Sequence, residues 1–328
     1  MIDKLADNRV YRSYLGGSRI DEFLTGLPGK DGSYPEDWLA STVEAFNPGH
    51  EIPGEGLGRT VDGRLIRDLV PNGLPILVKL LDAAQRLVIQ VHPTRTFARE
   101  RWHSPVGKTE SWYILKASPE ACVYIGFQPE ITRRAWEECF QTQNISRMLG
   151  FLHRFSVKPG DCIFVPGGVP HAIGGGCLMI ETQEPSDLMV IPERTTPSGI
   201  ALADSKLHGG LGFEGMMDCF SFEGATREEA HHRFFMQPKR LDDSCSCLLN
   251  GRENGLFSVI RLSVCGNYTR SFSQAMGIAV VLCGHGTLEL NGQTVEVSSA
   301  DRLLLRDLNQ GDLHIHGEPL DIVLALPD

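Results

Sequence analysis

Residues 280–305 read VVLCGHGTLELNGQTVEVSSADRLLL, and residues 157–181 read VKPGDCIFVPGGVPHAIGGGCLMIE. In both stretches, short aliphatic runs alternate with glycine-rich or Asn-Gly turns, which is typical of antiparallel hairpins. Similar runs fill both halves of the chain, whereas helical periodicity is rare. The sequence therefore predicts a mainly β protein with two tandem jelly rolls, in residues 1–235 and 236–328.

The expected strands of the first half share a high content of aliphatic and aromatic residues; they are PILVKLL, RLVIQVHP, ESWYILK, CVYIGF, FSVKPGDCIFVP and CLMIETQ. Those of the second half are LFSVIRLSVCG, AMGIAVVLCGHGTLELNG, QTVEVSSADRLLLRD and DIVLALP. In VVLCGHGTLELNGQTVEVSSADRLLL we expect a strand, a glycine turn, a second strand and then a strand that ends in a polar bend. Apolar residues in 132–155 recur every three to four positions, so we expect a short helical insertion near 131–154. The region after Gly17 is also expected to be helical.

The chain has 328 residues and a formal net charge of −10, which argues against nucleic acid or an anionic membrane as a partner. No apolar run approaches 18 residues, and the first residues lack the pattern of a signal peptide. The nine cysteines lie mostly in apolar runs, and we interpret them as reduced core residues of a cytoplasmic protein. We expect a monomer or a homodimer.

Polar residues interrupt the apolar run LVIQVHP at residues 87–93. Because side chains of a strand alternate between faces, Gln90 and His92 are expected on one face. By the same reasoning Lys108, Glu110 and Trp112 share a face in GKTESWYIL. Each of these polar groups would cost a few kcal/mol if it were buried without a partner, roughly 1–3 by mutational estimates.

Gln90, His92, Glu110 and His171 together offer an amide, two imidazoles and a carboxylate. Such a set suits zinc or another divalent ion and leaves an open position for a substrate. Each residue also has an ordinary interpretation, since a single histidine in a strand is more often a hydrogen-bonded core residue. The pattern alone does not decide between a metal site and separate structural roles.

The segment QVHPTRTFARERWHSPVGKTESWYIL resembles type I phosphomannose isomerases, in which QVHP is followed by GKTE. The later segment with PHAIG and a glutamate before Ser-Asp is similar to the same family, as are PEDWLAST, EGLG and YLGGSRI. The likeness extends from about residue 12 to residue 200. It implies two cupin barrels and an enzyme that interconverts mannose 6-phosphate and fructose 6-phosphate through an enediol.

The resemblance also implies one zinc ion per chain, or another divalent ion, held by Gln90, His92, Glu110 and His171. The second barrel would hold no metal, so we interpret His314 and His316 as non-ligands. Lys108 matches a lysine that stabilises negative charge, and Glu181 matches a glutamate near the reacting carbons. His92 and Glu181 both remain candidates for the general base.

The chain departs from the family in SDLMVIPERTTPSG, at residues 186–199. Ile191 stands where many members have an arginine, and Ser198 where a lysine often follows Thr-Pro. An arginine there would bind phosphate and stabilise the enediolate. We expect Arg194 to reach this space from a shifted loop. Two other cations of the sequence, Lys206 and Arg12, have no positional evidence in their favour.

Two alternatives follow from this departure. The enzyme would isomerise another sugar or an unphosphorylated one, or the chain would be a cupin that senses a sugar without turnover. The retained Lys108 and the complete set of four candidate ligands argue against a sensor.

Overall fold

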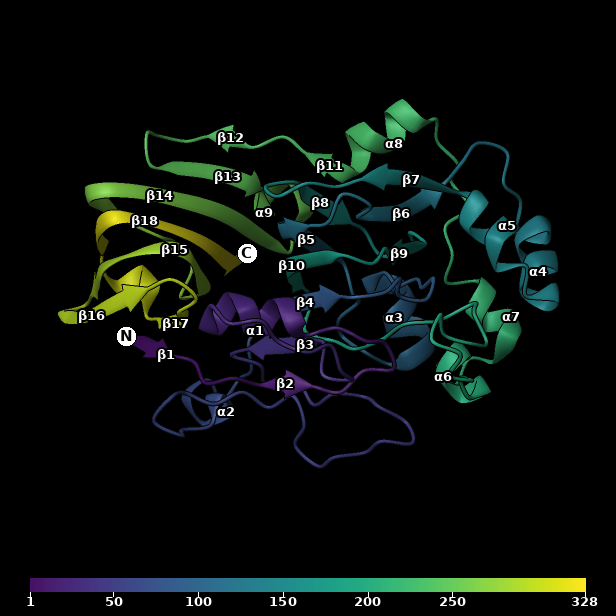
Figure 1. The fold of residues 1–328 in the computed structure, drawn as a ribbon, viewed down its shortest axis with the longest axis horizontal. Helices are drawn as coiled ribbons and strands as arrows, with labels where there is room; N and C mark the ends of the chain where they lie inside the picture. Colours follow the sequence, from purple (N-terminus) through teal and green to yellow (C-terminus); the bar gives the residue numbers. More distant parts are fainter.

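A seven-stranded antiparallel sheet forms the middle of the molecule in the computed structural model, which describes residues 1–328 (Figure 1). Its strands, in spatial order, are β11 (Phe235–Met236), β8 (Cys162–Val165), β5 (Glu110–Ala117), β10 (Cys177–Gln183), β4 (Leu77–Ala83), β3 (Glu36–Leu39) and β2 (Arg9–Val10). Strands β4 and β10 are buried along their whole length, including their polar residues Lys79, Asp82, Glu181, Thr182 and Gln183.

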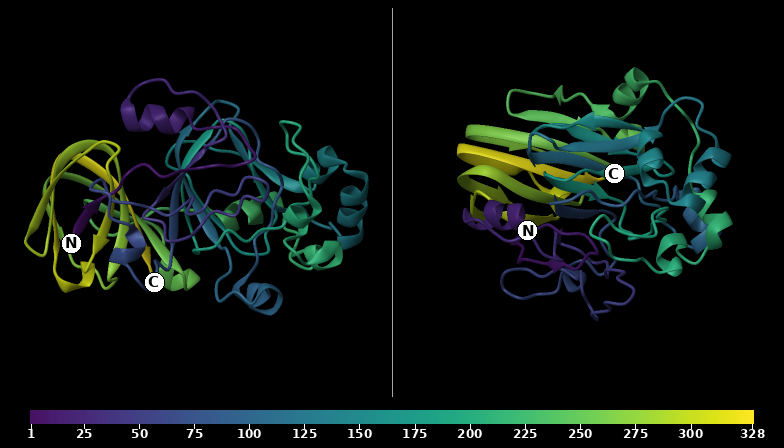
Figure 2. Two further views of the ribbon diagram at one scale, coloured as in Figure 1. Left: turned by 90° about the horizontal axis from the view of Figure 1, so that it is seen from below. Right: turned by 45° about the vertical axis from the view of Figure 1, so that its right-hand side comes forward.

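The strands of the C-terminal third, together with one strand from the beginning of the chain, form a second, eight-stranded sheet at one end of the molecule (Figure 2). Its main order is β1 (Ile2–Lys4), β17 (Arg302–Arg306), β15 (Met276–Leu290), β18 (Leu313–Pro327), β14 (Phe257–Arg270), β13 (Cys245–Leu249) and β12 (Lys239–Arg240), and β16 (Gln293–Ser298) pairs with β15. A third sheet has the order β7 (Leu152–Ser156), β6 (Cys122–Phe127) and β9 (His171–Ile173). The prediction of a mainly β chain is confirmed.

The helices are short and lie at the periphery of the sheets. They are α1 (Ser18–Thr25), α2 (Ile66–Leu69), α3 (Arg95–Trp102), α4 (Arg133–Thr142), α5 (Ile145–Gly150), α6 (Asp204–His208), α7 (Gly212–Met217), α8 (Arg227–Phe234) and α9 (Gly251–Asn254), with a 3₁₀ turn, η1 (Leu308–Gln310). Helices α4 to α7 gather at the end opposite the C-terminal sheet (Figure 1). No helix has the length and apolar character needed to cross a lipid bilayer.

One hydrophobic cluster of 23 buried residues joins the two larger sheets. It contains Val78 and Leu80 of β4 together with Val323 and Ala325 of β18. The chain also crosses between the sheets, because Ile2 in β1 pairs with Leu305 in β17. The domain boundary expected after residue 235 stays a prediction. One assignment is corrected, because β1, expected in the N-terminal unit, pairs with β17 and so belongs to the C-terminal sheet.

One expectation about local structure was wrong, because residues 87–93 form no regular strand and make only isolated bridges, from Gln90 to His171 and from Val91 to Val190. The helical insertion is present as α4 and α5 but ends at Gly150, because the following residues form β7. In the C-terminal sheet, a turn at Asn291-Gly292 joins β15 to β16, and the GHG stretch is a bulged part of β15.

All nine cysteines are free, and six of them are buried. Cys247 is partly buried. Cys265 and Cys283 are exposed, so the expectation that the cysteines are core residues is wrong for these two. Both lie in the long strands β14 and β15, near register shifts in the pairing of these strands.

Candidate active site

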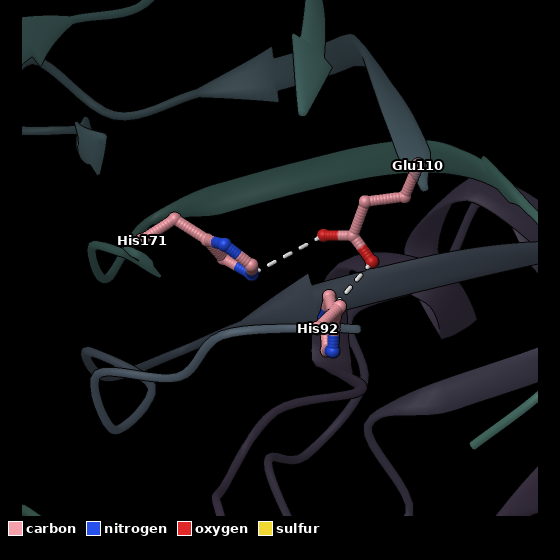
Figure 3. A group of neighbouring side chains, drawn as sticks. All are labelled: His92, Glu110 and His171. Atoms are coloured by element: carbon pink, nitrogen blue, oxygen red, sulfur yellow. Dashed lines mark ion pairs between the residues drawn. The ribbon is translucent and has the colours of Figure 1, made fainter. Parts of the chain in front are cut away.

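Three of the four candidate ligands converge in the first half of the chain. Glu110 begins β5, His171 begins β9, and His92 ends the extended stretch before α3. One ligand atom from each residue lies within 4.8 Å of the others, and all three side chains are buried. The Glu110 carboxylate faces both imidazoles, with Oε2 at 3.2 Å from His92 Nε2 and Oε1 at 3.4 Å from His171 Nε2 (Figure 3).

Backbone carbonyl groups fix the orientation of both imidazoles. His92 Nδ1 lies 3.0 Å from the oxygen of Leu188, and His171 Nδ1 lies 2.9 Å from the oxygen of Val169. Because a carbonyl oxygen only accepts hydrogen bonds, each Nδ1 carries the proton and each Nε2 keeps its lone pair. Burial lowers the pKa of both imidazoles, that of His92 to about 3. Both rings are therefore neutral, as metal ligands must be.

The Glu110 carboxylate is ionised despite its burial. Burial alone would raise its pKa, but the ammonium of Lys108 outweighs this and holds the pKa well below its usual range. Trp112 Nε1 donates to Glu110 Oε1 at 3.0 Å. His171 Nε2 has no hydrogen-bond partner, whereas Glu110 Oε2 is paired with the ammonium of Lys108. A buried imidazole lone pair is costly unless a donor or a cation satisfies it, so the donor set fits a divalent metal ion.

Gln90 lies directly opposite one of the ligands. Its backbone N–H and C=O both bond to those of His171, each at 2.9 Å. Its side-chain amide makes no hydrogen bond to any other group of the chain, and the residue is 9% exposed. The amide is thus available for a metal, and its role as fourth ligand stays a prediction.

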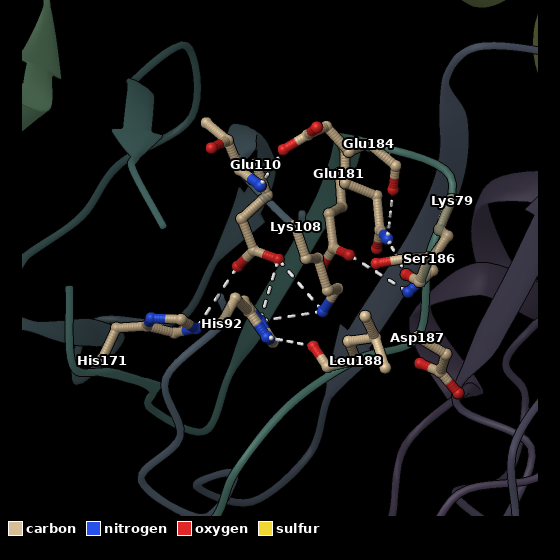
Figure 4. A network of polar contacts seen from close by, with 12 residues as sticks. Lys79, His92, Lys108, Glu110, His171, Glu181, Glu184, Ser186, Asp187 and Leu188 are labelled. Carbon is tan, nitrogen blue, oxygen red and sulfur yellow. Dashed lines mark hydrogen bonds and ion pairs between the residues drawn. The ribbon is translucent and has the colours of Figure 1, made fainter. Parts of the chain in front are cut away.

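Lys108 brings a positive charge to the same group. Its Nζ lies 2.8 Å from His92 Nε2 and 3.2 Å from Glu110 Oε2 (Figure 4). The residue is buried, so this charge acts in a medium of low polarity. A metal bound at the same lone pairs would require the ammonium to shift aside.

Glu181 stands in the strand next to Glu110 and is buried. In the register of the sheet it pairs with Trp112 on one side and with Lys79 on the other. Its Oε1 lies 3.1 Å from Lys79 Nζ. Burial raises the pKa of Glu181, and Lys79 only partly opposes this rise. The site therefore combines one ionised carboxylate with a second carboxyl group that holds its proton more readily.

Known proteins share this arrangement of strands. Over 99% of its length the chain superposes on 99% of the crystal structure of the mannose 6-phosphate isomerase from Bacillus subtilis, with a TM-score of 0.78 and 21% sequence identity. A variant of phosphomannose isomerase from Salmonella typhimurium superposes over the whole of both chains, with a TM-score of 0.71 and 14% identity. The chain has the fold of a phosphomannose isomerase. The fold implied by the sequence resemblance is thereby confirmed.

Curated relatives give the same result by sequence. The chain is 38% identical over 131 residues to the mannose-6-phosphate isomerase ManA of Bacillus subtilis, a stretch that covers 38% of each protein. It is 38% identical over 189 residues to the mannose-6-phosphate isomerase of Streptococcus mutans, covering 55% of this chain and 57% of the relative. The match thus spans about half, or less, of the length of these relatives. No family model matches the chain. The resemblance stated from the sequence motifs is confirmed.

A second buried charge network adjoins the site and was not predicted. Arg12 donates to both carboxylate oxygens of Asp187 at 3.1 Å, and its Nε lies 3.0 Å from Glu36 Oε1. Glu36 in turn lies 3.6 Å from Lys79 Nζ, and both cations lie about 5 Å from the ring of Trp38. The lysine within the apolar run PILVKLL was a signal for this network.

The structure does not bring Arg194 to this group. Its Nη1 pairs with Asp204 at 2.7 Å, and its guanidinium lies over the rings of Phe140 and Phe213. The expectation that Arg194 replaces the missing arginine is therefore not supported. Ile191 at that position is buried, and its side chain offers no charge.

In the C-terminal sheet, the two histidines of LHIHG lie exposed on β18. His314 Nδ1 contacts Thr269, and His316 Nδ1 lies 2.9 Å from Asn267.

Proposed function

We propose that the protein is a metal-dependent aldose–ketose isomerase that interconverts mannose 6-phosphate and fructose 6-phosphate. The observation that carries the proposal is the buried group of His92, Glu110 and His171, whose lone pairs converge beside Lys108. The names of the curated relatives and the shared fold support it. The substrate is accordingly a small sugar phosphate.

Zinc is the proposed metal, with Gln90, His92, Glu110 and His171 as its ligands. Two nitrogen and two oxygen donors fit zinc, although other divalent ions accept the same set. When bound, the metal would act as a Lewis acid that withdraws electron density from the sugar oxygens at C1 and C2.

Glu181 is the proposed general base. His92 is unsuitable, because its Nδ1 proton is held by Leu188 and its Nε2 faces the Glu110 carboxylate. Glu181 is a buried carboxyl group whose raised pKa lies nearer to neutrality. In the open-chain aldose it would take the proton from C2 and return it to C1, while the hydroxyl proton moves from O2 to O1. Lys108 would stabilise the negative charge on the enediolate oxygens.

A direct assay tests the proposal. Purified protein, freed of metal and reloaded with zinc, is given mannose 6-phosphate, and fructose 6-phosphate is followed over time. We expect turnover that a chelator abolishes and zinc restores. Glu181→Gln should keep the zinc and lose turnover, while Glu120→Gln, which changes an exposed carboxylate, should behave as the wild type. Absence of turnover with a zinc-loaded protein would contradict the proposal.

Ile191 favours a second candidate, an isomerase of unphosphorylated sugars, because the usual phosphate-binding cation is missing at this position. Free mannose and lyxose are therefore assayed in parallel. Turnover of the free sugars alone would establish this candidate, and sugar binding without any turnover would indicate a sensor. The cytoplasmic location and the monomeric or homodimeric state stay predictions.

A further inference from the structure

Lys206 in α6 is unusual among the cations of this chain. Every other lysine and arginine either forms an ion pair within 4.0 Å or is exposed to solvent. Lys206 is partly buried, and its ammonium has neither an ion pair nor a hydrogen bond. A lysine ammonium that is partly shielded from water and has no partner within the chain is free to bind an anion from outside it.

The charges around Lys206 do not provide that partner. Arg12, Asp187 and Glu36 are the charged groups that act on its ammonium. Both carboxylates are already bonded to Arg12, Asp187 through two hydrogen bonds and Glu36 through a contact of 3.0 Å. Burial and the repulsion of Arg12 lower the pKa of Lys206. A second anion beside Lys206 would relieve this repulsion.

Lys206 also lies next to the position where the sequence departs from its relatives. The backbone N–H of Ile191 donates to the carbonyl oxygen of Leu207 at 2.8 Å, which holds α6 against the segment around residue 191. The same segment contains Leu188, whose carbonyl oxygen fixes His92. The residue that follows Lys206 in α6 is therefore bonded to position 191, where the Ile191 side chain offers no cation.

We infer that Lys206 binds the phosphate group of the sugar substrate and does so in place of a cation at position 191. The inference rests on the proposed function, because it concerns the substrate of the same site. A lysine binds phosphate as a point charge with three donors, so it does not need the fixed geometry of an arginine. Arg12, oriented by Asp187 and Glu36, adds a second positive charge nearby and acts as a positioning residue.

The test compares Lys206→Met and Lys206→Arg with Lys158→Met, which removes an exposed lysine that has no ion pair. For Lys206→Met we expect the KM for mannose 6-phosphate to rise about 10- to 100-fold, the effect of losing one charge-assisted contact. We expect kcat to change little, and kcat/KM for free mannose to stay at the wild-type value. Lys206→Arg should recover part of the loss, and Lys158→Met should match the wild type.

Calorimetric titration with inorganic phosphate gives a readout that is independent of turnover. The wild type should bind phosphate, and Lys206→Met should bind it at least tenfold more weakly. If the wild type turns over mannose 6-phosphate but Lys206→Met leaves its KM and phosphate binding unchanged, the inference is wrong while the proposed function stands. An equal loss of activity toward mannose and mannose 6-phosphate would likewise overturn it, because phosphate would then not be what Lys206 recognises.

Discussion

Replacing Glu36 by glutamine would test the buried charge network beside the active site. The Glu36 carboxylate accepts hydrogen bonds from Tyr14 at 2.8 Å and from Trp38 at 2.7 Å. It also lies 3.0 Å from Arg12 Nε and 3.6 Å from Lys79 Nζ. A glutamine keeps one acceptor oxygen but turns an NH₂ group toward these donors, so at least two of the four contacts are lost.

The structure sets the size and the sign of the effect. Removing one partner of a buried ion pair costs about 3–5 kcal/mol of unfolding free energy. Arg12 keeps Asp187 and Lys79 keeps Glu181, so we expect a loss near the lower end, about 3 kcal/mol at pH 7. Burial would raise the pKa of Glu36, but Arg12 and Lys79 outweigh it and hold this pKa far below its usual range. The carboxylate therefore stabilises the fold fully above the unfolded-state pKa and progressively less as the pH falls below that value.

Urea unfolding followed by tryptophan fluorescence is the appropriate assay, because all four tryptophans lie between residues 38 and 136. Below about pH 4.3 the difference in unfolding free energy between the wild type and Glu36→Gln should narrow by about 1.4 kcal/mol per pH unit. Glu44→Gln, at an exposed position without an ion pair, should change stability by less than about 0.5 kcal/mol. A Glu36→Gln protein as stable as the wild type at pH 7, or a gap that widens in acid, would refute the reasoning.

Glu110→Ala should lose both metal and activity, whereas His316→Ala should lose neither. Metal analysis and the isomerase assay measure the two properties. Metal retained by Glu110→Ala would overturn the ligand assignment. Trp112→Phe removes the hydrogen bond to Glu110 Oε1, so we expect zinc affinity in a chelator competition to fall about 10- to 100-fold; an unchanged affinity would show that this bond does not orient the ligand. Gly284→Ala places a Cβ 1.8 Å from a carbonyl oxygen of β18 at a φ of 89°. In thermal unfolding, the Gly284→Ala protein should be less stable than the wild type by at least about 1–3 kcal/mol of unfolding free energy. Gly292→Ala, with a φ of 78° but open space, is the control, and an equal loss in both would show that the clash is absorbed.

The sequence was most informative where local pattern and chemistry agree. Period-two alternation and turn residues located most of the strands, because both depend on neighbouring residues. The faces inferred for His92 and Glu110 also agree with the structure, in which the two side chains lie together. The face argument held for His92 even though residues 87–93 form only isolated bridges, since extended backbone alternates in the same way.

Contacts between distant segments could not be predicted. The pairing of Arg12 with Asp187 joins residues 175 positions apart, and no local pattern encodes such a partner. The same limit applies to Arg194, whose contacts with α6 and α7 could not be inferred from its distance in sequence to Ile191. A charged residue inside an apolar strand, such as Lys79, is the kind of signal that merits a search for a buried partner.

The pairing of β1 with β17 has a consequence for synthesis of the protein. Residues 2–4 are synthesised long before their partners at 303–305. Contacts of such long sequence separation form slowly, because a long stretch of chain must be looped to close them. During translation β1 therefore has no partner strand until β17 has been made, so this part of the C-terminal sheet is completed late.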